Sequence, residues 1–189
     1  MRIIAGKFRG RKLKGPPSLD TRPTSDRLRE TLFNILAPRI VGARFLDLCA
    51  GSGAVGIEAL SRGAAHATFV DRSRKMSRLI EANLEALDVS QDGFEIVCSE
   101  AMKFLMGREK KAAPAFDIIF YDPPYATDYE DPLEYVGRHA LQLLTDDGMV
   151  IVEHHRKNEV SKEHGLLHRY RSLIQGDSAL SFYRRVVST

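Results

Sequence analysis

Apolar and polar residues alternate along the chain with two periods, and the pattern predicts strands separated by helices. Apolar residues three and four positions apart predict amphipathic helices, whereas short runs that are almost wholly apolar predict buried strands. The expected helices cover residues 24–36, 53–62, 73–87, 102–106 and 133–144. The expected strands that alternate with them cover residues 43–49, 66–71, 94–99, 116–122 and 148–154.

The order of these elements predicts an α/β fold. Strands connected through helices pair in parallel and build a doubly wound sheet. The last two strand-like runs, residues 168–174 and 179–187, have no helical pattern between them and predict an antiparallel hairpin. We therefore expect a mostly parallel, seven-stranded sheet with helices on both faces. Residues 21–189 would form this domain, after a small basic β extension of residues 1–20.

Composition narrows the class of protein. The 189 residues are 43% apolar and 28% charged, which is typical of a globular domain. No apolar run approaches the roughly 20 residues that span a bilayer, and the N-terminal residues lack the apolar core of a secretory signal. Cys49 and Cys98 match no disulfide framework or zinc spacing. A cytoplasmic protein without membrane or metal partners is expected.

The charged residues are unevenly distributed along the chain. The net charge is only +3, yet residues 1–19 contain six basic residues and no acid: Arg2, Lys7, Arg9, Arg11, Lys12 and Lys14. In a strand, Lys7, Arg9 and Arg11 would line one face, where they would attract a polyphosphate. A solvated edge strand protected by its charges is an equally good interpretation of this segment alone.

A glycine-rich turn follows the first strand. Gly51, Gly53 and Gly56 fit the G-x-G-x-x-G pattern between a strand and a helix, and Asp71 ends the next strand 20 residues after Gly51. Such a turn lets a ligand approach the backbone, and the acid is placed to hydrogen-bond ribose hydroxyls. NAD, another adenosine cofactor and a merely tight connection all remain open on this evidence.

Asp47 separates these alternatives. It precedes Gly51 by four residues, at the end of the first strand. A carboxylate there would repel a pyrophosphate and attract a cationic amino group. S-adenosylmethionine carries an ammonium and a sulfonium, so Asp47 favours this cofactor over NAD. A turn-capping role for Asp47 is the alternative.

The sequence D-P-P-Y follows the fourth strand. Pro123 and Pro124 hold the chain extended, and Asp122 with a proline carbonyl could accept two hydrogen bonds from an exocyclic amine. Tyr125 could stack on a planar base. A rigid turn after a strand is the alternative, and it is weakened by the acid and glycine loop that precedes it in the chain.

These motifs together resemble a known family. The motifs "DLCAGSG" and "DPPY" are similar to those of class I S-adenosylmethionine-dependent methyltransferases that modify exocyclic amines. With "MRIIAGKFRGRKLKGP", "TRPTSDRLRETLFNIL", "FVDRS" and "VIVEHH", the chain resembles the RsmD family of 16S rRNA guanine-N2-methyltransferases along nearly its whole length. Cys49 and Glu100 depart mildly from the usual pattern, which has a larger apolar residue and an Asp there.

The resemblance implies a role for each matching residue. Asp47, Gly51 and Gly53 would hold the methionine part of S-adenosylmethionine, and Asp71 would hold its ribose. The remaining cofactor contacts implied are Thr24, Arg29, Ala50, Ser52, Arg72, Glu100, Ala101 and Asp122. Catalysis would rest on Asp122, Pro123 and Tyr125, which would hold the guanine. The residues implied to contact RNA are Lys7, Arg9, Arg11, Lys12, Pro124 and Tyr125.

The resemblance also implies the reaction and the partners. The guanine 2-amino nitrogen would take the sulfonium methyl directly and leave S-adenosylhomocysteine, with no metal. The RNA would be 16S rRNA, within a small ribosomal subunit particle, and the enzyme would be a monomer. An adenine or protein-glutamine methyltransferase, an NAD-linked oxidoreductase and a non-catalytic RNA-binding assembly factor are the alternatives. Asn83 shares the apolar stripe of its helix, so it needs a buried polar partner, for which a site loop is a candidate.

Overall fold

The computed structural model describes residues 1–16, 25–109, 115–123 and 130–186. The chain divides into two compact units, Met1–Ser99 and Glu100–Thr189, which are described one at a time. No helix in the described part of the chain is both long and apolar enough to span a bilayer.

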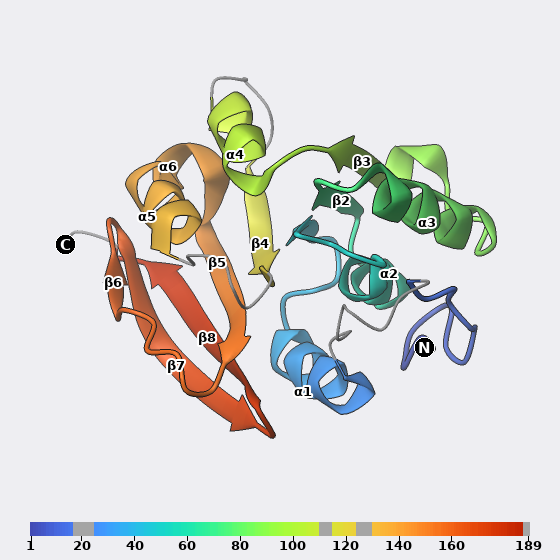
Figure 1. The fold of residues 1–189 in the computed structure, drawn as a ribbon, viewed down its shortest axis with the longest axis horizontal. Coiled ribbons are helices and arrows are strands. Elements are labelled where there is room, and N and C mark those ends of the chain that lie inside the picture. The colour runs from blue at the N-terminus through green and yellow to red at the C-terminus, as the bar shows by residue number, and fades with distance from the viewer. Residues whose placement is uncertain (17–24, 110–114, 124–129, 187–189) are drawn as a thin grey trace. The chain divides into compact units, whose positions relative to one another are not determined.

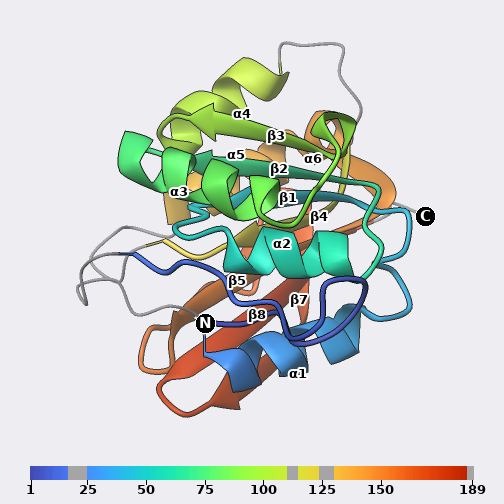
Figure 2. The ribbon, with the colours of Figure 1, turned by 90° about the vertical axis from the view of Figure 1, so that its right-hand side faces the viewer.

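The first unit is built on three parallel strands. They are β1 (Arg44–Leu48), β2 (His66–Asp71) and β3 (Phe94–Cys98), with β2 paired to both neighbours. Helices α2 (Ala54–Ser61) and α3 (Arg74–Glu85) pack against these strands, and a short 3-10 turn, η1 (Gln91–Gly93), precedes β3. Figure 2 shows α2 and α3 side by side over the strands.

Helix α1 (Asp26–Leu36) begins after a serine that caps its first turn. Ser25 is the N-cap, and its hydroxyl accepts a hydrogen bond from the Leu28 N–H, which satisfies one open donor of the first turn. The buried face of α1 contributes Phe33, whose ring stacks on Phe45 of β1 at a centroid distance of 6.2 Å. This contact joins α1 to the core of the first unit.

The N-terminal segment, residues 1–16, is not the strand that was expected. It folds back on itself through turns and forms one isolated antiparallel bridge, between Arg2 and Lys12. Gly6 and Gly10 have φ of +82° and +81°, so the chain reverses direction where alternation predicted an extended strand. The apolar side chains of the segment enter the core shared by α2, α3 and β2; they are Ile3, Phe8 and Leu13.

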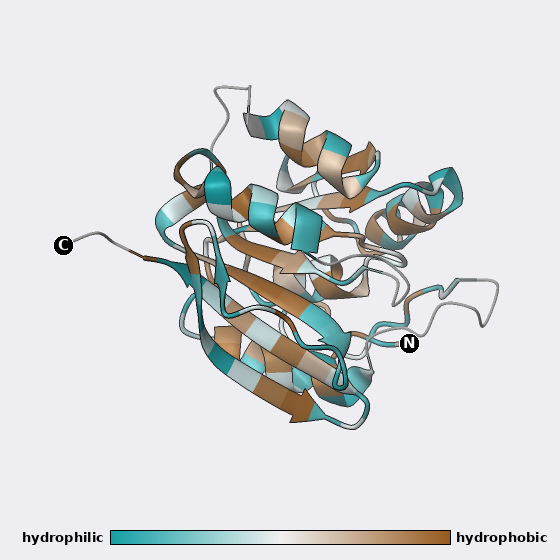
Figure 3. Cartoon of the chain, turned by 60° about the vertical axis from the view of Figure 1, so that its left-hand side comes forward, coloured by the Kyte–Doolittle hydropathy of each residue, from teal (hydrophilic) through white to brown (hydrophobic). Residues whose placement is uncertain are grey.

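The second unit combines one parallel pair with an antiparallel sheet. Strand β4 (Phe116–Tyr121) pairs in parallel with β5 (Leu144–His155). The antiparallel strands follow in the order β5, β8 (Ser178–Arg185), β7 (Leu167–Gln175) and β6 (Glu163–His164). Figure 1 shows β7 and β8 as the long C-terminal hairpin, and Figure 3 shows hydrophilic and hydrophobic residues interspersed along the strands of this unit.

The helices of the second unit correct two of the expected boundaries. Helix α4 covers Ala101–Glu109, longer than the short helix expected at 102–106. The helix expected at 133–144 is divided into α5 (Glu130–Arg138) and α6 (Ala140–Leu143), with non-helical dihedral angles at His139 between them. The mixed α/β class and the C-terminal antiparallel hairpin are confirmed. The described residues form one strand more than expected, because the short β6 was not predicted.

Candidate functional site: the glycine loop of the first unit

The loop after β1 turns through three residues with positive φ. Cys49 has φ +70°, Gly51 +53° and Gly53 +77°, and Gly53 is the N-cap of α2. A non-glycine residue rarely adopts such a φ, and backbone strain of this kind gathers at ligand-binding turns. The loop therefore begins with a strained cysteine and enters the helix through glycines.

The three glycines of the pattern have different surroundings. A Cβ added at Gly51 would meet no heavy atom of the described residues within 4 Å, so the backbone there has room for a ligand. A Cβ at Gly53 would lie 2.9 Å from Cγ1 of Ile80, and one at Gly56 would lie 2.3 Å from Cε1 of Phe69. Gly51 thus leaves room for a ligand, whereas Gly53 and Gly56 allow α2 to approach its neighbours closely.

Asp47 is the buried charge of the loop. Its side chain is 2% exposed, and Oδ2 accepts a hydrogen bond of 2.8 Å from the Gly56 N–H. Burial raises the pKa of Asp47 from 3.8 to about 7; the Gly56 hydrogen bond opposes this rise, and nearby Asp71 adds to it. Among the ion pairs of the described residues, none joins Asp47 to an Arg or Lys. A carboxylate in this position fits a cationic amino group.

Asp71 stabilises the loop from the end of β2. Its Oδ2 accepts a hydrogen bond of 2.8 Å from the Gly51 N–H, and its Oδ1 accepts one of 2.8 Å from the Ser73 N–H. Ser73 is in turn the N-cap of α3 and accepts from the Met76 N–H. Asp71 therefore fixes the first glycine while remaining half-buried, and Arg72 beside it is exposed.

Asn83 has the partner that its buried position requires. Its Oδ1 accepts from the Lys14 N–H at 2.9 Å, and its Nδ2 donates to the Lys14 carbonyl at 3.1 Å and to the Ser52 carbonyl at 3.4 Å. The Ser52 carbonyl is the site-loop partner considered for Asn83, while the two shorter hydrogen bonds go to Lys14 of the N-terminal segment. Ser52 also donates through its hydroxyl to the Met1 sulfur at 3.7 Å. The glycine loop is thus tied to the N-terminal segment, and Ala50 lies half-buried within it.

Glu58 was not singled out in the sequence, and the structure makes it the anchor of the N-terminal segment. Its carboxylate is fully buried in α2 and accepts from the Ile4 N–H at 2.8 Å and the Ala5 N–H at 3.0 Å. Arg62 donates to it through Nε at 2.7 Å, and Nε of Arg29 lies 3.7 Å away. The signal in the sequence was a single acid within an otherwise apolar helix.

Arg29, an expected cofactor contact, lies in this network. Its side chain is fully buried, and Nη2 donates to the Arg2 carbonyl at 2.7 Å and to Oδ1 of Asp26 at 2.9 Å. Nη1 of Arg29 has no hydrogen-bond partner among the residues that the structure describes. The structure thus gives Arg29 a role in holding the N-terminal segment on α1, and its contact with a cofactor stays a prediction.

The four expected RNA-contacting residues of the N-terminal segment are all exposed; they are Lys7, Arg9, Arg11 and Lys12. The Lys7 ammonium lies 5.3 Å from the ring centre of Phe8, and Arg11 donates to the Ala86 carbonyl of the first unit at 2.5 Å. Phe8 between them and the flanking Ile3 and Leu13 are buried in the core, so these cations stand on a turn that is packed against the first unit.

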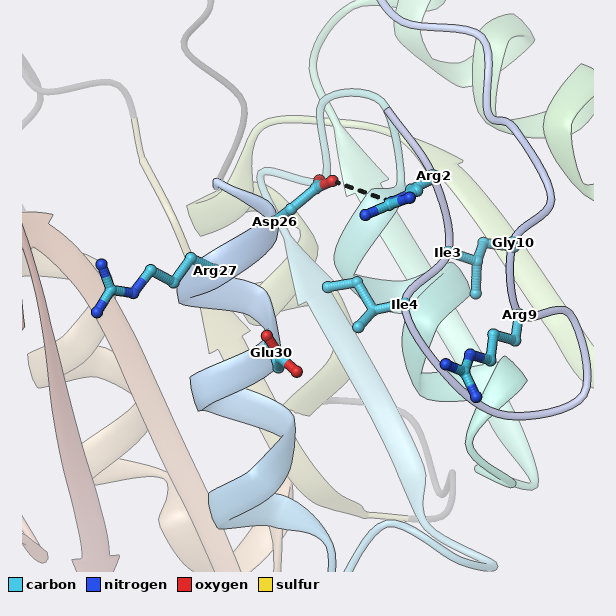
Figure 4. Close-up of a pocket in the computed structure, with 8 residues that line it drawn as sticks. All are labelled: Arg2, Ile3, Ile4, Arg9, Gly10, Asp26, Arg27 and Glu30. Carbon is cyan, nitrogen blue, oxygen red and sulfur yellow. Dashed lines mark ion pairs between the residues drawn. The ribbon is translucent and has the colours of Figure 1, made fainter.

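A pocket of about 450 Å³ lies between this segment and α1, as Figure 4 shows. Nε of Arg2 stands 3.8 Å from Oδ2 of Asp26 at its edge. Three arginines and two acids give the pocket a mixed charge. Its lining consists of Arg2, Ile3, Ile4, Arg9, Gly10, Asp26, Arg27 and Glu30. This pocket does not include the glycine loop.

The remaining predicted residues fall in the second unit or outside the described residues. Asp122 follows β4 and is half-buried, and Pro123 is buried. Glu100 is exposed and precedes α4, whose first residue, Ala101, is half-buried. Thr24, Pro124 and Tyr125 lie outside the described residues. In the described ranges, no group of three His, Cys, Asp or Glu side chains is arranged to hold a metal ion.

The chain is similar to a family model, to a named protein and to solved structures. The family model described as "Conserved hypothetical protein 95" matches residues 1–184. Ribosomal RNA small subunit methyltransferase D of Escherichia coli is 40% identical over 98% of this chain and 90% of that protein. A solved structure of a candidate methyltransferase from Escherichia coli has a TM-score of 0.83 at 39% identity, covering 98% of this chain and 97% of that chain.

A more distant structure shares only the fold. A SAM-dependent methyltransferase from Agrobacterium tumefaciens has a TM-score of 0.65 at 18% identity, over 89% of this chain and 64% of that chain. The family match, by contrast, includes the N-terminal segment, the glycine loop and the D-P-P-Y sequence. The chain therefore belongs to the family described as "Conserved hypothetical protein 95", which is the RsmD family that its sequence resembles.

Proposed function

We propose that this protein transfers a methyl group from S-adenosylmethionine to small-subunit ribosomal RNA, at the exocyclic 2-amino group of a guanine. The observation that carries the proposal is the 40% identity to ribosomal RNA small subunit methyltransferase D over nearly the whole chain. The buried Asp47 beside an open Gly51 gives the same proposal an independent chemical basis.

The residues of the glycine loop fit the cofactor. Asp47 would pair with the ammonium of the methionine part, and the open backbone at Gly51 would lie against it. Asp71 would accept from ribose hydroxyls, and Glu100 with the Ala101 backbone would lie near the adenine. When bound, S-adenosylmethionine supplies a methyl group made electrophilic by the sulfonium. Asp71 already holds the loop through the Gly51 N–H, so the cradle is formed before a ligand enters.

The substrate side rests on the D-P-P-Y sequence. Asp122 and the Pro123 carbonyl would accept the two N–H bonds of the guanine amine, and Tyr125 would stack on the ring. These acceptors direct the nitrogen lone pair and stabilise the positive charge that develops on nitrogen. The nitrogen–carbon bond forms as the carbon–sulfur bond breaks, and the nitrogen then loses a proton. S-adenosylhomocysteine is the other product.

The setting of the reaction is also part of the proposal. We propose a cytoplasmic monomer that needs no metal and acts on 16S rRNA within a small-subunit particle. Because a stacked base cannot enter a pocket, the target guanine would lie in a loop or an opened helix. The exposed cations of the N-terminal segment would position the RNA.

One experiment separates this function from its alternatives. The protein is incubated with methyl-labelled S-adenosylmethionine and small-subunit particles from a strain that lacks the enzyme, and the labelled nucleotide is identified by mass spectrometry. N2-methylguanine at one position is the expected product. If N6-methyladenine is found instead, the target is an adenine. If the protein binds RNA but transfers no label, it is a non-catalytic assembly factor. Binding of NADH in place of S-adenosylmethionine would indicate an oxidoreductase.

The division of roles between the two motifs has its own test. We expect Asp122→Ala to lower the rate of methyl transfer about a hundredfold or more, because it removes an acceptor that stabilises developing charge. S-adenosylmethionine affinity, measured by isothermal titration calorimetry, should stay within a few-fold of the wild type. Loss of affinity in proportion to loss of rate would contradict the assignment of Asp122 to the base.

A further inference from the structure

A β-bulge in the C-terminal hairpin brings together side chains that a regular strand would separate. The pairing of β7 with β8 shifts between Arg169 and Arg171, which leaves Tyr170 as the extra residue. In a regular strand, Tyr170 and Arg171 would point to opposite faces, whereas a bulge re-aims one of them. The Tyr170 ring centre lies 6.3 Å from that of Phe182, and Cζ of Arg171 lies 5.9 Å from the same ring. Both side chains therefore occupy one face of the hairpin, over Phe182.

Arg184 completes the group from the neighbouring strand. Its guanidinium carbon lies 4.4 Å from the ring centre of Tyr170, in the range of a close cation–π contact. Phe182 beneath is fully buried, whereas Tyr170 is 39% exposed. Arg171 and Arg184 are exposed as well. We call Tyr170, Arg171 and Arg184 the arginine–tyrosine platform: an aromatic ring and two guanidinium groups held on a rigid sheet.

The charge of the platform is uncompensated within the described residues. Two other arginines of this unit have carboxylate partners: Arg185 is 2.7 Å from Asp146, and Arg156 is 3.6 Å from Asp177. Neither Arg171 nor Arg184 takes part in any ion pair of the described residues. The two guanidinium groups of the platform are thus available to an external anion.

We infer that the arginine–tyrosine platform is a stacking surface for unpaired bases of the RNA substrate. Proteins hold single-stranded RNA by stacking its bases on aromatic rings and guanidinium planes, and by neutralising its phosphates with the same arginines. A group that only covered Phe182 would need neither an exposed ring nor two unpaired cations. The inference rests on the proposed function, and it adds a second RNA contact to that of the N-terminal segment. Stacking tolerates every base, so the platform recognises strandedness rather than sequence.

The test measures RNA affinity of the full chain by fluorescence anisotropy. The probes are a labelled 12-nucleotide oligo(U), an oligo(A) of the same length and a perfectly paired RNA hairpin. We expect Tyr170→Ala to weaken binding of both single strands about tenfold without changing the salt dependence, and Tyr170→Phe to bind like the wild type. Arg184→Gln should weaken binding and reduce the slope of log affinity against log salt by about one. Binding of the hairpin should change least.

Matched variants keep the result interpretable. Ile174→Ala alters an exposed residue of the same strand, 65% exposed and paired with Ala179, on the opposite face. Arg156→Gln removes a cation that is already paired. Both should bind like the wild type, and circular dichroism melts should show that every variant is folded. The inference would be overturned if folded Tyr170→Ala and Arg184→Gln bound RNA with wild-type affinity. It would also be overturned if Ile174→Ala lost as much RNA affinity as they do, or if polyglutamate competed for binding as effectively as oligo(U).

The two proposals fail separately. S-adenosylmethionine binding and methyl incorporation are measured on the same samples. If the platform variants methylate small-subunit RNA and bind oligo(U) as well as the wild type does, the proposed function stands and the platform inference fails. If the wild type incorporates no methyl groups but Tyr170→Ala weakens its binding of oligo(U), the platform inference stands and the proposed function fails.

Discussion

Asp47→Asn should make the folding stability of the ligand-free protein less dependent on pH. Burial holds the pKa of the native carboxyl near 7 against an ordinary value of 3.8. A folded-state pKa above the unfolded value contributes stability that is complete below pH ~4 and is lost as pH rises towards 7. Asn at this position can still accept the Gly56 N–H bond through its amide oxygen, so the variant removes the ionisation with little change of shape.

The magnitude follows from the two pKa values. Each pKa unit corresponds to about 1.4 kcal/mol, so ionising Asp47 in the folded protein costs about 4 kcal/mol in total. Because the unfolded carboxyl is largely ionised by pH 5, roughly 2–3 kcal/mol of that cost falls between pH 5 and pH 8. The free energy of unfolding of the wild type should therefore decline by about this amount relative to Asp47→Asn over the same interval.

The assay is urea unfolding followed by circular dichroism at pH 5, 6, 7 and 8, since the chain contains no tryptophan to report by fluorescence. Asp92→Asn, at an exposed acid in the same unit, controls for the loss of one negative charge. Parallel stability profiles for the wild type and Asp47→Asn would refute the reasoning. A second measurement uses the cofactor: an ammonium requires the ionised carboxylate, so wild-type affinity for S-adenosylmethionine should be about tenfold lower at pH 6 than at pH 8.

Three further predictions concern packing, anchoring and charge. Gly56→Ala should destabilise the fold by about 1–3 kcal/mol in urea unfolding, because the new methyl would meet the buried Phe69 ring at 2.3 Å; unchanged stability would show that the ring yields freely. Glu58→Gln should lower the free energy of unfolding by about 3 kcal/mol and speed hydrogen exchange at the amides of the N-terminal segment, because the buried Arg29 would lose one of its two carboxylate partners and keep only Asp26. Joint replacement by Gln of the exposed cations Lys7, Arg9 and Arg11 should weaken RNA binding and flatten its salt dependence. An unchanged slope of log affinity against log salt would assign these cations to solubility instead.

Most of the strands and helices and the glycine loop could be predicted, because each depends on nearby residues. Apolar runs found β1, β2 and β4 within a residue or two. The spacing of Gly51, Gly53 and Gly56 indicated a tight entry into a helix, and their surroundings bear this out. Asn83 could be recognised as a buried amide that needs a hydrogen-bond partner, because it lies on the apolar stripe of its helix.

Other features depend on contacts between distant parts of the chain. The N-terminal segment alternates like a strand, but a Cβ on Gly6 would lie 1.8 Å from the Ser61 carbonyl oxygen, so docking on α2 decides its shape. Glu58 anchors that segment across more than fifty residues of sequence, which no local period reveals. The bulge at Tyr170 has no sequence signal either, because the shift in pairing is set by where β8 lies.

The docking of the N-terminal segment bears on how RNA is held. Its backbone donates to Glu58 and Ser61 of α2 and exchanges two hydrogen bonds with Asn83 of α3. Its apolar side chains lie in the core. A basic arm that was disordered before binding would lose conformational entropy on meeting RNA, and that loss would subtract from its affinity. Here folding has already ordered the segment, so its exposed cations can contribute more of their electrostatic attraction to binding. Because Asn83 also holds the Ser52 carbonyl, the same amide fixes the cations relative to the glycine loop.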